Sequence, residues 1–145
     1  ITAWVKGATI GYGHLISKSE WDTYKNGINT TQADDLFRKD LQPFANAVNE
    51  KVTADISQNQ FDALVILTFN IGINAFGTSS VLKLVNDPAA TTSYPDLESA
   101  WKAWNKSQGQ VMQGLVNRRN AEWDIYSQNI YKNLKNRSVV LIFYH

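Results

Sequence analysis

The chain has 145 residues, of which 43% are hydrophobic, and its 14 Lys and Arg against 13 Asp and Glu give a formal net charge of +1. This length and apolar content suit a single globular domain, 1–145, with one core, and argue against wholesale disorder. The near-neutral charge argues against nucleic acid as a partner, because proteins that bind phosphate backbones carry a large basic excess. The absence of cysteine excludes disulfides and thiolate catalysis.

The sequence predicts neither a metal site nor a membrane span. His14 and His145 lie at opposite ends of the chain without the spacing of a histidine zinc site, so we expect no metal. No stretch approaches the roughly 20 consecutive apolar residues that cross a bilayer. The apolar run 139–144 is too short for that purpose and is predicted as a strand or a non-native tail, with 136–145 as the tail.

The first 29 residues differ in pattern from the rest of the chain. They combine β-formers with Gly7, Gly11 and Gly13, which favours a small β-rich lobe. From Thr30 onward the apolar residues recur at helical spacing, so the predicted fold class is α+β. The first predicted helix begins at the capping-box-like segment 31–34, and Pro43 is expected to kink or divide it.

Four more helices are predicted farther along the chain. The first begins after a Ser57 cap and ends at Gly72, and its apolar residues surround most of its circumference, so it is the expected central core helix. A short helix starts at Ser79 or Ser80 and runs through Val85. The remaining two are predicted over 97–104 and from near 113 to about 126, and 89–94 is predicted as an exposed loop.

Three motifs occur in order along the chain. They are Thr9-Ile10-Gly11-Tyr12-Gly13-His14, Phe69-Asn70-Ile71-Gly72 and Gly114-Leu115-Val116-Asn117-Arg118-Arg119. With these motifs the chain resembles the phage-type lysozymes, glycoside hydrolase family 24, from Trp4 to about Tyr126. The resemblance implies a small β-rich N-terminal lobe, a larger helical lobe and a cleft between them. It also implies cleavage, without a cofactor, of the β-1,4 bond between N-acetylmuramic acid and N-acetylglucosamine in peptidoglycan.

The catalytic residues of that family are only partly matched. In the family, a Glu-Gly pair carries the general acid and is followed by Leu-x-x-Tyr-x-Asp. Here 1–4 resembles the Leu-x-x-Tyr part, so the glutamate is expected before Ile1, and Val5-Lys6 stands where the family has a residue and then Asp. Thr9 matches the catalytic threonine, which helps to place the attacking water. We therefore expect the printed chain not to turn over peptidoglycan at a normal rate, and normal lysis of bacterial walls would contradict this.

Four residues match positions that line the sugar-binding cleft of the family: Leu15, Phe69, Asn70 and Ser79. Three of them have a structural explanation as well. An aromatic on an apolar helix is a core residue by default, which applies to Phe69, and Leu15 is treated in the same way. Ser79 is equally suited to cap the short helix that follows it.

Supporting roles are implied for Gly11, Tyr12, Gly13, His14 and Arg118. The counterpart of His14 is a structural residue that pairs with a carboxylate, and the glycines are expected to shape tight turns beside the cleft. Arg118 matches an arginine that can pair with the catalytic glutamate. Arg119 competes for this assignment, since Glu122 lies within helical reach of both arginines.

Two alternatives to a muramidase remain open. A lysozyme-like domain without its acids would bind glycan strands without cleaving them, or serve as part of a larger assembly. The coding sequence upstream of Ile1 would separate this reading from the enzyme. An unrelated α+β protein with accidental motifs is the third reading, against which the three ordered matches argue. The expected partner is bacterial peptidoglycan, acted on at the cell wall by a monomer, and the sequence leaves the export route open.

Overall fold

The computed structural model describes residues 3, 6, 8–10 and 14–131, which form two compact units. The N-terminal unit holds the described residues up to Gln42, and the helical unit begins at Pro43. Gly7, Gly11, Tyr12, Gly13 and the tail 136–145 lie outside the described residues. In the described part of the chain no helix is both long and apolar enough to cross a membrane.

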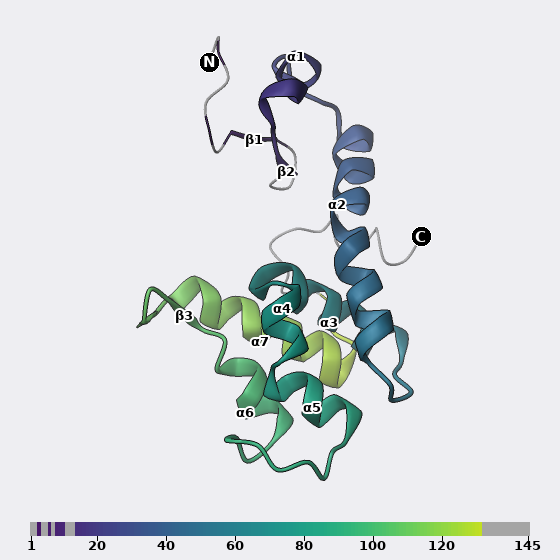
Figure 1. Cartoon of the computed structure of the whole chain (residues 1–145), viewed down its shortest axis with the longest axis vertical. Helices are drawn as coiled ribbons and strands as arrows, with labels where there is room; N and C mark the ends of the chain where they lie inside the picture. Colours follow the sequence, from purple (N-terminus) through teal and green to yellow (C-terminus); the bar gives the residue numbers. More distant parts are fainter. Residues whose placement is uncertain (1–2, 4–5, 7, 11–13, 132–145) are drawn as a thin grey trace. The chain divides into compact units, whose positions relative to one another are not determined.

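The N-terminal unit contains a minimal hairpin. Strand β1 (Thr9–Ile10) pairs antiparallel with β2 (His14–Leu15), in the register Thr9 to Leu15 and Ile10 to His14 (Figure 1). The expected β-rich lobe is therefore confined to four strand residues among those described. The chain then turns helical in η1 (Lys18–Glu20) and α1 (Trp21–Tyr24). The helical turn starts here because the backbone N–H and the hydroxyl of Ser17 donate to Glu20 Oε1, at 3.1 and 2.9 Å.

Helix α2 (Thr30–Lys51) is longer and starts earlier than the sequence pattern indicated. Its cap is Asn29, whose Oδ1 accepts from the Gln32 N–H at 2.8 Å while Gln32 Oε1 accepts from the Asn29 N–H at 2.9 Å. Of the two outcomes expected at Pro43, a kink or a division, the division is wrong, because α2 continues through the proline as one helix. Burial of apolar side chains on both sides of it, such as Leu41 and Val48, offsets the lost hydrogen bond.

Helix α3 (Gln58–Ile71) forms the centre of the helical unit, as predicted. Ser57 caps it, and it ends where Gly72 takes φ +99°, a left-handed conformation that favours glycine. Every residue of the stretch 62–68 is buried, and α3 packs against α7 (Gln113–Gln128). Within this buried stretch Asp62 accepts hydrogen bonds from Gln58 Nε2 and Tyr131 Oη, both at 2.7 Å.

Three shorter helices complete the helical unit. They are α4 (Ile73–Gly77), α5 (Ser80–Asn86) and α6 (Leu97–Lys102), with α5 packed on α6 and α6 on α7. The predictions for α5, α6 and α7 are confirmed to within two residues, whereas α4 was not predicted. The largest fully buried apolar side chains of this unit come from α3, α4, α6 and α7, and include Trp101, Phe76, Leu64, Leu67 and Ile125.

A second hairpin, also missed in the sequence, joins α6 to α7. Strand β3 (Lys106–Ser107) pairs antiparallel with β4 (Gln110–Val111). At the base of the hairpin, one residue beyond each strand, the Met112 N–H donates to the Asn105 carbonyl at 2.9 Å. Its two turn residues, Gln108 and Gly109, both have positive φ, +52° and +78°. That is the conformation of the tight turn preferred in two-residue hairpins. In Figure 1 this hairpin projects from the helices of its own unit.

Candidate functional site

Thr9 and Leu15, two of the predicted site residues, face the same side of the β1–β2 hairpin. They are register partners, and directly opposite residues of an antiparallel pair point to the same face. Both are exposed, and Leu15 keeps 63% of its surface open to solvent, which is unusual for a leucine. The N-terminal unit therefore presents a hydroxyl and an apolar side chain together at its surface.

His14 is held on both sides of its ring by carboxylates. Nδ1 lies 2.9 Å from Asp40 Oδ2 on α2, and Nε2 lies 3.2 Å from Glu20 Oε2. The ring of Tyr24 packs edge-on against the imidazole, with the ring centroids 5.7 Å apart. Partial burial opposes a charge on the ring, but the hydrogen bonds and charges of the two acids outweigh it and raise the pKa of His14 above 6.5. The expected structural pairing with a carboxylate is present, and Glu20 adds a second one.

Asp40→Asn is expected to lower the free energy of unfolding by about 1.5 kcal/mol at pH 6, the weaker end for hydrogen bonds to charged groups. Because the pKa of His14 is higher in the folded chain than in the unfolded one, protonation of the ring stabilises the fold. This stabilisation is complete below the unfolded-state pKa near 6.5 and is lost as the pH rises through the folded-state pKa. The loss should therefore be smaller at pH 9. Urea unfolding at the two pH values measures it, with exposed Asp35→Asn on the same helix as control; equal losses at both pH values would contradict the expectation.

In the helical unit a charged network is sealed inside the core. Glu122 is 0% exposed, and its two oxygens accept from Trp101 Nε1 at 3.0 Å and from Arg119 Nη2 at 2.7 Å. Arg119 is 1% exposed, and its Nη1 donates to the Trp104 carbonyl at 3.3 Å. Burial raises the pKa of Glu122 to about 7, opposed by the charge of Arg119 and the Trp101 hydrogen bond. The network ties α6, α7 and the start of the hairpin together.

Arg119 also reaches a pocket of about 650 Å³. Two aromatic side chains, Tyr94 and Trp104, line it together with Asn70, whose amide can both donate and accept hydrogen bonds. None of the lining residues is acidic. They are Asn70, Ile71, Tyr94, Ala103, Trp104, Lys106, Ser107, Leu115 and Arg119.

The other predicted residues of the helical unit lie in different settings. Asn70 is exposed and lines the pocket, whereas the neighbouring Phe69 is half-buried and packs edge-on against Phe44, with ring centroids 5.1 Å apart. Ser79 is 5% exposed, and its hydroxyl donates to the Phe76 carbonyl and accepts from the Leu82 N–H, which is the helix-cap alternative. Arg118 is exposed on α7 and does not line the pocket.

Several pocket residues were missed by sequence reasoning. Tyr94 lies in the loop expected to be merely exposed, and Lys106 in the hairpin that was not predicted. The Gln108-Gly109 pair was the available signal for the hairpin. For Arg119 the signal was its spacing of three residues from Glu122.

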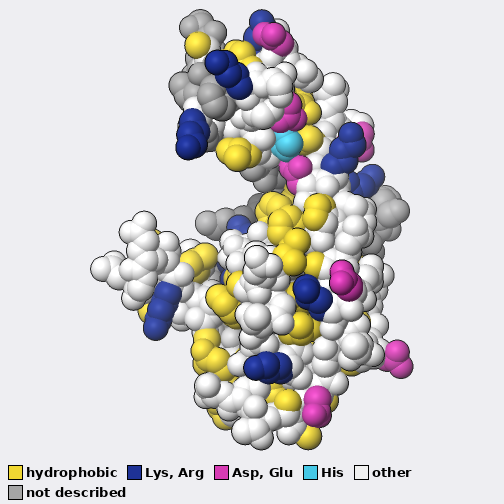
Figure 2. Space-filling model, in the orientation of Figure 1, with side chains coloured by type: hydrophobic (Ala, Val, Ile, Leu, Met, Phe, Trp, Pro, Cys, Tyr) yellow, Lys and Arg dark blue, Asp and Glu magenta, His cyan; other side chains and the backbone are white. Residues whose placement is uncertain are grey.

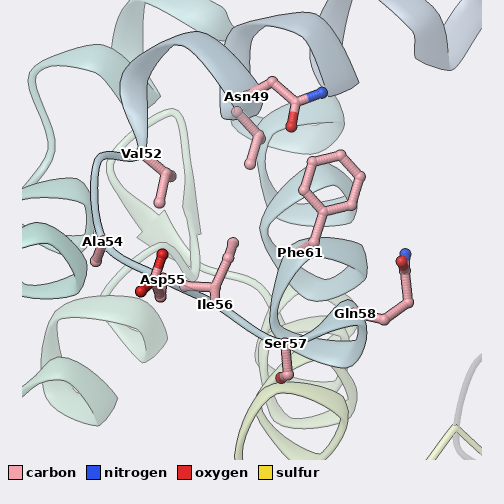
Figure 3. A pocket seen from close by; sticks show the side chains of 9 residues that line it. Asn49, Val52, Ala54, Asp55, Ile56, Ser57, Gln58 and Phe61 are labelled. Atoms are coloured by element: carbon pink, nitrogen blue, oxygen red, sulfur yellow. The ribbon is translucent and has the colours of Figure 1, made fainter.

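A second pocket of about 500 Å³ lies at the junction of α2 and α3. Figure 3 shows Val52, Ile56 and Phe61 facing a shared space, with Asp55 at its edge. No predicted site residue lines this pocket, and its lining carries no positive charge. Among the described residues no cluster of three or more His, Asp or Glu side chains is suited to hold a metal ion.

The charges on the surface form no single patch in the visible face. Within the helical unit Figure 2 shows Lys and Arg side chains spaced apart, with Asp and Glu side chains among them and apolar areas between. Such mixed charge is typical of an ordinary protein surface. The visible face of the helical unit therefore presents no broad field of one sign.

Comparison with known proteins gives one family. Residues 2–122 match the sequence model described as Phage lysozyme. The chain is 39% identical over 129 residues to the endolysin of Bacillus phage PZA, covering 89% of this chain and 47% of that one. It is thus about half the length of this relative. It is 34% identical to the endolysin of Salmonella phage P22, covering 79% of this chain and 75% of that one.

A solved structure agrees with the sequence matches. The muramidase domain of SpmX from Asticaccaulis excentricus superposes with a TM-score of 0.67 at 38% identity, covering 83% of this chain and 79% of that one. The three motifs noted in the sequence fall inside the matched range 2–122. This chain is therefore a member of the phage lysozyme family, with the α+β fold of that family.

Proposed function

We propose that this chain is the glycan-binding part of a muramidase that cleaves the β-1,4 bond between N-acetylmuramic acid and N-acetylglucosamine in bacterial peptidoglycan. The observation that carries the proposal is the pocket of the helical unit, where Tyr94, Trp104 and Asn70 combine aromatic faces with an amide. Such a lining suits a sugar, whose ring faces are apolar and whose rim is polar. Membership of the phage lysozyme family supports the choice of glycan.

In the N-terminal unit, taken by itself, we propose roles for Thr9 and Leu15. Thr9 is exposed, as a hydroxyl that positions a water must be, and Leu15 beside it offers apolar contact to a sugar. We assign Asn70 and Leu15 to substrate binding, and Phe69 to support of α3 through Phe44. The protein would act at the cell wall as a monomer.

The hydrolytic step sets a further requirement. Glycosidic bond cleavage needs a protonated carboxylic acid at the leaving oxygen. No acidic residue lines the pocket, and Glu122 is committed to Arg119 and Trp101 inside the core. The pocket of the helical unit therefore supplies binding groups and no general acid, and we expect little bond cleavage from its lining alone.

The test separates binding from cleavage. The purified chain is sedimented with bacterial wall sacculi, and the supernatant is analysed by mass spectrometry for fragments with new reducing ends at N-acetylmuramic acid. Binding with few such fragments is expected. Failure to bind sacculi, or release of peptides rather than glycans, would overturn the proposal.

Asn70→Ala is expected to weaken binding to sacculi by about fivefold. This corresponds to the loss of one hydrogen bond that contributes about 1 kcal/mol. The residue is exposed, so the fold should not change. Asn74→Ala is the matched control, because Asn74 is also exposed but lies on α4 outside the pocket lining. Equal affinity of the two variants would remove Asn70 from the site.

A further inference from the structure

The pocket of the helical unit carries an uneven charge. Its lining contains two cations, Lys106 and Arg119, and no acid. The charge of Arg119 is matched inside the core by Glu122 at 2.7 Å. Lys106 is exposed, and among the described residues it makes no ion pair. Lys106 is therefore the uncompensated positive charge of the pocket.

The hairpin holds this charge in a defined place. Lys106 is the register partner of Val111, and the tight turn at Gln108-Gly109 keeps the two strands paired. The base of β3 is fixed from the core side, because Arg119 Nη1 donates to the Trp104 carbonyl two residues before Lys106. The backbone that bears the lysine is thus connected to the buried network, while its ammonium group stays free to meet a ligand.

The chemical structure of wall glycans indicates which group an unpaired cation in this pocket could bind. Every second sugar of peptidoglycan carries a lactyl ether, whose carboxyl group is free or extended by a peptide with carboxylates of its own. A polymer of N-acetylglucosamine alone has the same backbone and no such group. A lysine beside a sugar pocket can distinguish these two ligands by charge.

Building on the function proposed above, we infer that Lys106 is a specificity-determining residue that makes the pocket select glycan strands bearing carboxylates over uncharged ones. The aromatic and amide groups bind the sugar shared by both polymers. The lysine adds affinity only where a carboxylate is attached. The selected ligand is therefore an anionic muramyl glycan, and the neutral polymer is bound more weakly.

The experiment compares one wall polymer with and without its negative charges, and adds a neutral polymer that lacks the carboxylate-bearing groups altogether. Binding of the full chain is measured to sacculi stripped of other wall polymers, to the same sacculi after amidation of their carboxylates, and to chitin. Lys106→Gln is expected to weaken binding to untreated sacculi about two- to fivefold, the range for one exposed ion pair. It should leave binding to amidated sacculi and chitin unchanged, and Lys106→Arg should keep the preference.

The control is Lys83→Gln, since Lys83 is exposed on α5 and lies outside the pocket lining. A wild-type chain that binds none of the three ligands would reject the proposed function itself. A wild-type chain that binds sacculi while Lys106→Gln binds them equally well would reject only the inference about Lys106. Equal weakening by Lys106→Gln toward all three ligands would also reject it, because charge selection would then be absent.

Discussion

Replacing Glu122 with alanine is expected to lower the free energy of unfolding by about 3–5 kcal/mol, the loss typical of breaking a buried ion pair. Arg119 is 1% exposed, so its charge would remain in the core without its partner at 2.7 Å. The Trp101 indole N–H would lose its acceptor as well. Urea unfolding at pH 8, above the Glu122 pKa of about 7, measures the loss with the carboxylate ionised.

Two comparisons make this expectation specific. Glu98→Ala removes a carboxylate that pairs with Lys102 at the surface, and its loss should stay below about 1 kcal/mol. The double variant Arg119→Met with Glu122→Leu removes both charges and should recover part of the loss, because apolar side chains of similar size can replace a buried pair while the Trp101 N–H still lacks its acceptor. A loss in Glu122→Ala no larger than in Glu98→Ala would show that the pair does not stabilise the fold.

The same residues show where sequence reasoning reaches its limit. Glu122 is three residues from Arg119 and four from Arg118, and both spacings bring side chains together on a helix. One residue along a helix is a rotation of about 100°, which places Arg119 in the core and Arg118 in solvent. Only the packing of α7 against α3 and α6 decides between them, and no local pattern contains that information.

Elements defined by local interactions were predictable. The Ser57 cap, the apolar run of α3 and the glycine at its end act within a few residues of one another, and the structure confirms all three. Whether Pro43 divides a helix depends on what the flanking side chains bury, and the sequence did not show that α2 continues through it.

The pocket combines segments that are far apart in the sequence. Asn70 lies in the last turn of α3 and Tyr94 in the loop before α6. Lys106 belongs to the hairpin and Arg119 to α7. Periodicity describes each segment separately and gives no distance between them. The family resemblance identified Asn70 and left its neighbours in the pocket unassigned.

Trp101 is the residue for which the second large effect is expected. Its ring is 0% exposed and contacts Trp123 at 5.7 Å and Tyr126 at 5.0 Å between ring centroids. Trp101→Ala should lower the free energy of unfolding by about 3–5 kcal/mol, through lost burial and the cavity left behind. Thermal and urea unfolding measure this loss, and a value under 1 kcal/mol would mean that α6 and α7 close over the space.

Trp101→Phe separates the ring from its hydrogen bond. Phenylalanine keeps an aromatic group beside Trp123 and Tyr126 but has no donor for Glu122, so a loss of about 1.5–3 kcal/mol is expected, in the range for hydrogen bonds to charged groups. In a Glu122→Leu background the donor has no partner to lose, so Trp101→Phe should cost less there, leaving only the effect of the smaller ring. Equal effects in both backgrounds would assign the contribution of Trp101 to its ring alone, and the network would then consist only of Arg119 and Glu122.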